Sequence, residues 1–133
     1  MHPKEIRFKQ RFENFKKAFA QLEKAVNDYN RLNILEKEGL IQRFEYTFEL
    51  SWKLLKDYLE AKGLMVKFPR DTLKLAFETE IIKNGEKWME MLEFRNITAH
   101  TYDEKNFNIA LEKVVKEFYK ELKALFNFFN NEK

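Results

Sequence analysis

Apolar residues recur at intervals of three and four positions along most of this chain, which is the pattern of amphipathic helices. The first of these stripes predicts one helix from about residue 4 to Asn30, with Lys and Glu on its other faces. Its apolar positions are Phe8, Phe12, Phe15, Phe19, Leu22 and Val26.

A second long helix is predicted between Asn33 and Gly63. Asn33 and Glu36 have the spacing of a capping box, and Gly63 suits a C-terminal stop. The segment FEYTFELSWK is apolar on more than one side, which favours a helix buried both in its own bundle and at an interface with a second copy. The buried face is expected to carry Leu40, Phe44, Phe48, Trp52, Leu55 and Leu59.

Three further helices follow. The segment LMVKFPR contains Pro69 and is predicted to be a connection, after which Asp71 is expected to cap a short third helix. A break at Gly85 separates it from a fourth helix that ends around AHTY, and Asp103 is expected to cap a last long helix. The three stripes are Leu73, Ala76, Phe77 and Ile81, then Trp88, Met91, Leu92 and Ile97, and finally Phe107, Leu111, Val114, Phe118, Leu122, Leu125 and Phe129.

These elements predict an all-α protein, an up-and-down, four-helix-bundle-like fold of five helices in a single domain over residues 1–133. The scarcity of turn residues, three Gly and two Pro, agrees with long helices. Most of the fourteen Phe fall on helical stripes, so we interpret them as core residues before ligands for nucleobases.

The amino-acid composition limits the kinds of site and partner that this chain can have. The net charge of +3 is only mildly basic and does not by itself indicate a nucleic-acid-binding protein. The chain has no Cys, which excludes disulfides, thiol catalysis and Cys-based zinc sites. There is no apolar stretch near the ~18 residues of a membrane span and no signal-peptide pattern. We therefore expect a cytoplasmic protein without membrane association.

The remaining candidate for chemistry is the segment RNITAHTY, residues 95–102, which holds one of the two His of the chain. No motif predicts a metal site, no Gly-rich loop predicts a phosphate cradle, and the only serine, Ser51, lies mid-helix near the apolar stripe. No cofactor or metal ion is therefore expected.

On a helix, Asn96 and His100 would share one face, with Arg95 beside them and Tyr102 near the helix end. Arg offers a planar fork of donors to phosphate oxygens. His exchanges protons near neutral pH. Asn can orient a phosphate, and Tyr can hydrogen-bond or stack on a base. A second interpretation, simpler from spacing alone, is that Arg95 pairs with Glu93 or another surface acid and His100 only caps a helix end.

RNITAHTY resembles the R-x4-H-x-Y motif of HEPN-domain proteins of the HepT kind, a family also described as nucleotidyltransferase substrate-binding proteins. The segments GLIQRFEYTFELSWKLLKDYLEAKG and GEKWMEMLEFRNITAHTYDE resemble the signature segments of that family, and the resemblance covers nearly the whole chain. It implies a homodimer with Arg and His of both chains in one cleft, and an MNT-type nucleotidyltransferase as partner.

In HepT-like systems the HEPN protein is an RNA-cleaving toxin, which the nucleotidyltransferase inactivates by adding AMP to the motif tyrosine. The resemblance thus implies catalytic roles for Arg95, Asn96 and His100, and modification of Tyr102. The predicted function is metal-independent cleavage of RNA. The family's older description implies an alternative, a non-catalytic substrate- or nucleotide-binding subunit of a two-chain nucleotidyltransferase. A structural dimer with an inactive motif is a third interpretation.

Overall fold

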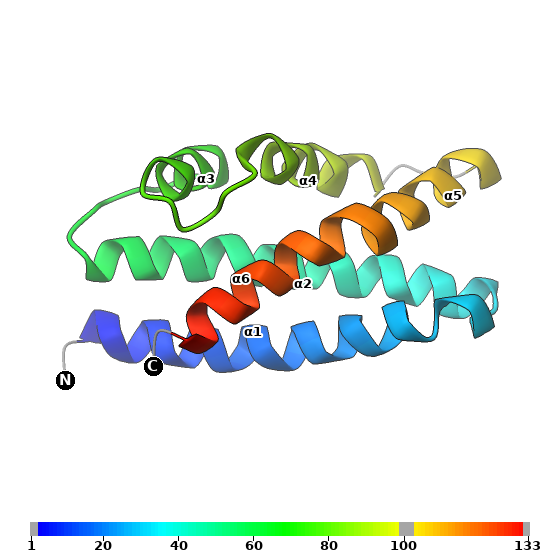
Figure 1. Ribbon diagram of the computed structural model, residues 1–133, viewed down its shortest axis with the longest axis horizontal. Helices are drawn as coiled ribbons and strands as arrows, with labels where there is room; N and C mark the ends of the chain where they lie inside the picture. The colour runs from blue at the N-terminus through cyan, green and yellow to red at the C-terminus, as the bar shows by residue number, and fades with distance from the viewer. Residues whose placement is uncertain (1–2, 99–102, 132–133) are drawn as a thin grey trace.

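The computed structural model describes residues 3–98 and 103–131, with the side chains of 96–98 outside that description. Two long antiparallel helices, α1 (Pro3–Asn27) and α2 (Ile34–Ala61), lie side by side along its length (Figure 1). The predicted first helix is shorter than expected, because a 3-10 turn, η1 (Tyr29–Arg31), replaces its last residues.

The predicted ends of α2 are confirmed. The side chain of Asn33 accepts a hydrogen bond from the backbone N–H of Glu36 at 2.8 Å, and the Glu36 carboxylate accepts one from Asn33 at 2.9 Å. At the other end Gly63 has a φ of +88°, and the backbone N–H of Leu64 donates to the carbonyl of Leu59 at 2.9 Å. A residue with a side chain would be strained at that φ, so Gly63 closes the helix there.

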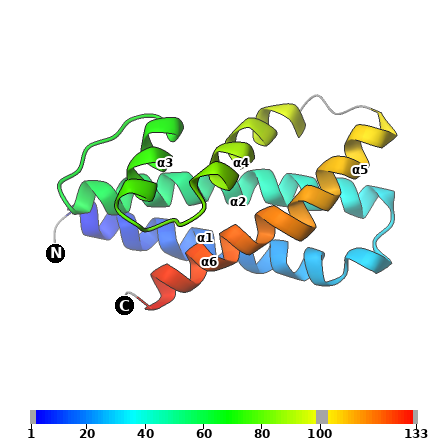
Figure 2. The same cartoon turned by 45° about the horizontal axis from the view of Figure 1, so that its top comes forward.

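Two shorter helices, α3 (Pro69–Glu78) and α4 (Gly85–Thr98), together form the third arm of the bundle (Figure 2). The predicted cap at Asp71 was wrong. Pro69 occupies the first turn of α3, where its missing N–H costs nothing, so the helix begins before Asp71 and that residue lies in its first turn. The break before α4 lies at Asn84, whose side chain accepts from the N–H of Lys87 at 3.1 Å, and Gly85 is already helical.

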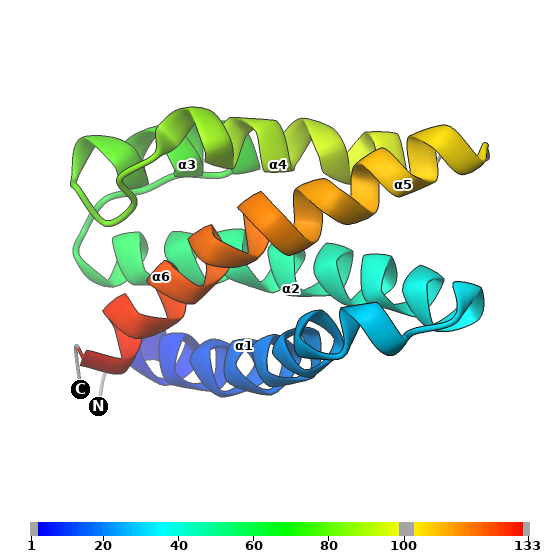
Figure 3. The ribbon, with the colours of Figure 1, turned by 45° about the vertical axis from the view of Figure 1, so that its right-hand side comes forward.

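The last predicted helix corresponds to three consecutive elements that form one continuous helical segment. They are α5 (Glu104–Lys113), a π-helical turn η2 (Val114–Phe118) and α6 (Tyr119–Asn131). Asp103 caps it as predicted, accepting from the N–H of Asn106 at 2.7 Å. This helix crosses α1 and α2 obliquely and returns to the end of the molecule where α1 starts (Figure 3). The predicted all-α, up-and-down bundle is confirmed, and the described residues contain no strand.

The core is built from the predicted stripes. Phe44 on α2 packs on Phe118 of η2 with ring centroids 5.4 Å apart, and Phe19 of α1 packs on Phe126 at 5.1 Å. Aromatic pairs of this kind give a small core much apolar contact area. One stripe residue was placed wrongly, because Phe77 on α3 is 49% exposed. Within the described residues, no helix is long and apolar enough to cross a membrane.

Candidate functional site

Two of the four predicted site residues lie where α4 ends. Arg95 and Asn96 belong to the last turns of α4, which runs to Thr98. His100 and Tyr102 lie outside the described residues, as does the side chain of Asn96. Arg95 is therefore the one predicted site side chain whose surroundings the structure describes.

Arg95 forms an ion pair with Glu49 of α2, its Nη1 donating to the Glu49 carboxylate. The pair is partly exposed, at 24% for the Arg95 side chain and 35% for that of Glu49. The other oxygen of Glu49 accepts a hydrogen bond from the indole N–H of Trp52 at 3.1 Å. A carboxylate held from two sides gives the guanidinium a defined position.

Glu49 is a site residue that the sequence did not point out. The ion pair expected from the simpler interpretation does exist, but its acid belongs to α2 and not to the Arg95 helix. Because Glu49 and Arg95 are 46 positions apart, helical spacing could not pair them. The available signal was that Glu49 lies in FEYTFELSWK, one of the segments that carry the family resemblance.

A network of charges ties α4 to the last helix just before the site. Lys87 of α4 donates to Glu90 at 2.8 Å and to Glu117 of η2, while Lys113 of α5 donates to Glu90. Hydrogen bonds from Lys113 and Lys87 hold the pKa of Glu90 below its usual value, and those to Glu117 and Glu90 raise the pKa of Lys87. Lys87 and Glu90 therefore stay charged at neutral pH, and their ion pairs hold α4 against α5 and η2.

A groove of about 560 Å³ lies between the starts of α2 and α5, next to the motif in sequence. Asp103 directly follows the motif and lines this groove together with the ring of Phe107 and the amide of Asn108. The ring of Phe107 can stack on a base and the Asn108 amide can hydrogen-bond its edge. Glu38, Asp103 and Glu104 also line the groove, against the single cation of Lys37, and their carboxylates would repel a phosphate backbone. In the described part of the chain, no three or more His, Asp or Glu side chains gather as metal ligands.

The structure thus gives Arg95 a defined position, and Arg95 is the first residue of a segment that also contains a His and a Tyr. Arg binds phosphate oxygens through its planar donors, and a His supplies proton transfer near neutral pH. This combination suits binding or cleavage of a phosphate ester.

Comparison with known proteins shows which family and which relatives this chain resembles. The family described as nucleotidyltransferase substrate binding protein like matches residues 10–131. A Haemophilus influenzae protein named Probable ribonuclease HepT is 35% identical over 71 residues. That match covers 50% of this chain and 49% of the relative, so the chain aligns with about half of that relative's length.

Two solved structures share the fold. A Thermus thermophilus protein superposes with a TM-score of 0.75 at 28% identity, covering 85% of this chain and 96% of that one. HI0074 of Haemophilus influenzae, described as the fold of a substrate binding domain of a nucleotidyltransferase, has a TM-score of 0.76 at 26% identity. That match covers 90% of this chain and 98% of HI0074. The family description links these proteins to nucleotidyltransferases. Since the family match covers nearly the whole helical bundle, this chain belongs to the family of nucleotidyltransferase substrate binding protein like proteins.

Proposed function

We propose that this chain is a HepT-like ribonuclease that acts in the cytoplasm as the toxin of a pair with an MNT-type nucleotidyltransferase. The observation that carries the proposal is the Arg95–Glu49 ion pair, which positions a guanidinium at the first residue of RNITAHTY. The similarity to a protein named Probable ribonuclease HepT supports the same activity.

The proposed reaction is cleavage of RNA without a metal ion. His100 takes the proton from a ribose 2′-hydroxyl, whose oxygen then bonds to the adjacent phosphorus. The bond from phosphorus to the 5′-oxygen breaks, and that oxygen receives a proton from a second imidazole. Arg95 stabilises the negative charge that develops on the phosphoryl oxygens. Asn96 orients the phosphate or the imidazole.

Two imidazoles require two chains, because each chain has one His outside its first two residues. The proposed homodimer would use the outer face of α2. Leu35 is 76% exposed and Tyr46 is 59% exposed, and helical spacing places both on the same face as Glu49. A dimer across this face would bring the two Arg95 sites together and cover these apolar side chains.

Tyr102 is the proposed site of control. Its modification with AMP would place a bulky anion beside Arg95 and His100. The added phosphate would compete for the guanidinium and repel the RNA backbone, so the modified protein would not cleave.

The second candidate function is a non-catalytic subunit that binds substrate for a separate nucleotidyltransferase. It is favoured by the family description and by the description given for HI0074. In that case Arg95 and His100 bind a phosphate or nucleotide without breaking a bond.

One experiment separates the two candidates. The chain is purified after expression alone and after expression with its nucleotidyltransferase, and both samples are tested for RNA cleavage and for intact mass. We expect cleavage by the first sample only, and added mass in AMP units at Tyr102 in the second. Intact RNA and an unchanged mass in both samples would exclude the toxin and favour the binding subunit.

A further inference from the structure

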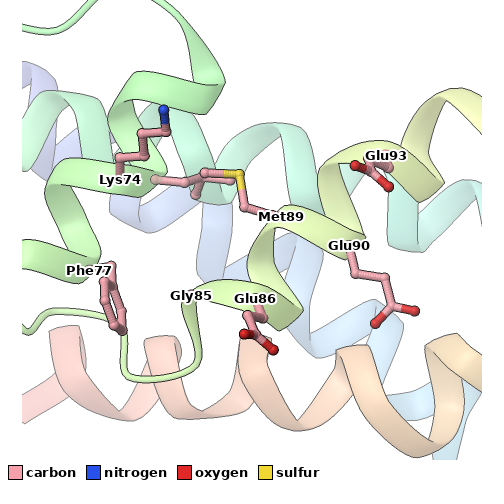
Figure 4. Close-up of a pocket in the computed structure, with 8 residues that line it drawn as sticks. Lys74, Phe77, Gly85, Glu86, Met89, Glu90 and Glu93 are labelled. Atoms are coloured by element: carbon pink, nitrogen blue, oxygen red, sulfur yellow. The ribbon is translucent and has the colours of Figure 1, made fainter.

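An apolar groove of about 490 Å³ lies between α3 and α4, on surface that the proposed reaction does not use (Figure 4). Leu73 and Phe77 of α3 and Met89 of α4 line it. Phe77 is 49% exposed although it belongs to the apolar stripe of its helix. The exposed part of the ring lies in a groove that Leu73 and Met89 also line, and a contiguous apolar surface of this kind can bind a partner.

The Phe77 ring lies close to Gly85, the glycine that begins α4. A Cβ atom added at Gly85 would lie 3.0 Å from the ring atom Cδ1, closer than carbon atoms ordinarily approach. The absence of a side chain at Gly85 therefore lets the ring rest on the backbone of α4. Phe77 therefore forms the wall of the groove beside Gly85.

The groove is also lined by charges of mostly one sign. Glu86 and Glu93 of α4 line it, and neither forms an ion pair within the described part of the chain. Glu90 lies between them but is already neutralised by Lys87 and Lys113. On the α3 wall stands Lys74, which likewise has no ion pair among the described residues. These carboxylates contrast with the net charge of +3 of the whole chain.

The charges that line the groove favour some ligands over others. RNA is disfavoured, because its phosphates would face Glu86 and Glu93. A helix with an apolar stripe and flanking Lys or Arg satisfies both the apolar lining and the unpaired carboxylates. The groove runs along α4 from Gly85 to Glu93, which is about 12 Å at 1.5 Å per residue and matches roughly two turns of helix.

We propose that the α3–α4 groove docks a basic, amphipathic helix of the partner nucleotidyltransferase. Apolar side chains of that helix contact Phe77 and Met89, its Lys or Arg residues pair with Glu86 and Glu93, and one acidic residue faces Lys74. The inference rests on the proposed function for its choice of partner. It places the partner on α4, the helix that carries Arg95 and precedes Tyr102 in the sequence.

The test uses charge reversal at the two unpaired carboxylates. The double variant Glu86→Lys, Glu93→Lys is compared with the control Glu5→Lys, Glu112→Lys, which changes the net charge equally on exposed positions of α1 and α5. Binding to the purified nucleotidyltransferase is measured by calorimetry at low salt, and helix content by circular dichroism. We expect about tenfold or greater loss of affinity for the groove variant, since attraction becomes repulsion at two sites, and no loss for the control.

The outcomes separate the two levels of the proposal. If the wild-type chain binds and the groove variant binds equally well, the groove is not the docking site, while the partnership stands. If the wild-type chain does not bind, the partnership itself is wrong, and the groove proposal falls with it. If the groove variant changes the oligomeric state in sedimentation while binding is kept, the occupant is a second copy of this chain. RNA cleavage by the chain alone is independent of all three results.

Discussion

Two Arg–carboxylate pairs connect α2 to its neighbours, and they differ in how deeply the acid is buried. Arg11 of α1 donates to Asp57 at 3.0 Å, and Arg95 of α4 donates to Glu49. The two arginines are similarly accessible, at 30% and 24% of their side-chain area. The acids are not, since Asp57 is 4% exposed and Glu49 is 35% exposed.

The difference separates a structural pair from a pair suited to function. A buried carboxylate without its partner is strongly destabilising, so Arg11 is needed to balance Asp57 wherever the bundle is folded. A partly exposed carboxylate such as Glu49 is screened by water, and its ion pair contributes little to stability. Arg95 can therefore be exchanged at small cost to the fold, which is what a residue that binds a substrate requires.

The variant Arg95→Ala gives the strongest test of whether the Arg95–Glu49 pair serves function and not stability. We expect loss of RNA cleavage by about 100- to 1,000-fold, the usual effect of removing a donor that stabilises transition-state charge. The free energy of unfolding should fall by no more than about 1 kcal/mol, because the pair is partly exposed. Single-turnover cleavage and urea unfolding of the same sample measure both quantities.

Arg11→Ala tests the other member of the comparison. We expect the free energy of unfolding to fall by about 3 kcal/mol, because Asp57 remains buried without its cation. The double variant Arg11→Ala, Asp57→Ala should recover part of that loss, since it removes the unpaired charge as well. Cleavage measured below the unfolding transition should stay at the wild-type rate. If Arg95→Ala proves the more unfolded of the two variants, the functional assignment of the pairs is reversed.

The comparison also shows what the sequence could and could not predict. The helices follow from apolar stripes and local caps, so the capping box at Asn33 and the cap at Asp103 were predictable from a few neighbouring residues. Asp71 was misplaced as a cap because Pro69 also favours the first turn of a helix, and the two signals lie two residues apart. Phe77 was assigned to the core because a stripe shows which face is apolar, not whether a neighbouring helix covers it.

Both ion pairs join residues 46 positions apart, and no local rule connects such partners. The sequence identified Arg95 through its motif but left open which acid it meets. That choice depends on how α4 lies across α2, which buried side chains such as Trp88 and Phe48 settle through packing, with ring centroids 6.2 Å apart. His100 and Tyr102 lie outside the described residues, so their roles stay predictions.

The smallest expected effect, and the one that most sharpens the comparison, comes from Glu49→Gln. The amide keeps the size of the side chain and one oxygen that can accept from Arg95, but it removes the negative charge. If Glu49 positions Arg95, the guanidinium will be held less firmly, and the cleavage rate should fall by about tenfold, or 1.4 kcal/mol, with little change in KM. The control is Glu112→Gln on α5, where the exposed carboxylate lies 3.7 Å from Lys116, and it should leave the rate unchanged.

The direction of the Glu49→Gln effect decides what the pair does. A positioning carboxylate gives a lower rate, because the guanidinium must be pointed at the phosphate before charge develops on it. A competing carboxylate gives a higher rate and a lower KM, because the same guanidinium then has one fewer anion to bind besides the RNA. An increase would mean that the pair restrains the enzyme. Glu49 would then act like the AMP group proposed at Tyr102, because both would be anions that bind the Arg95 guanidinium in competition with RNA.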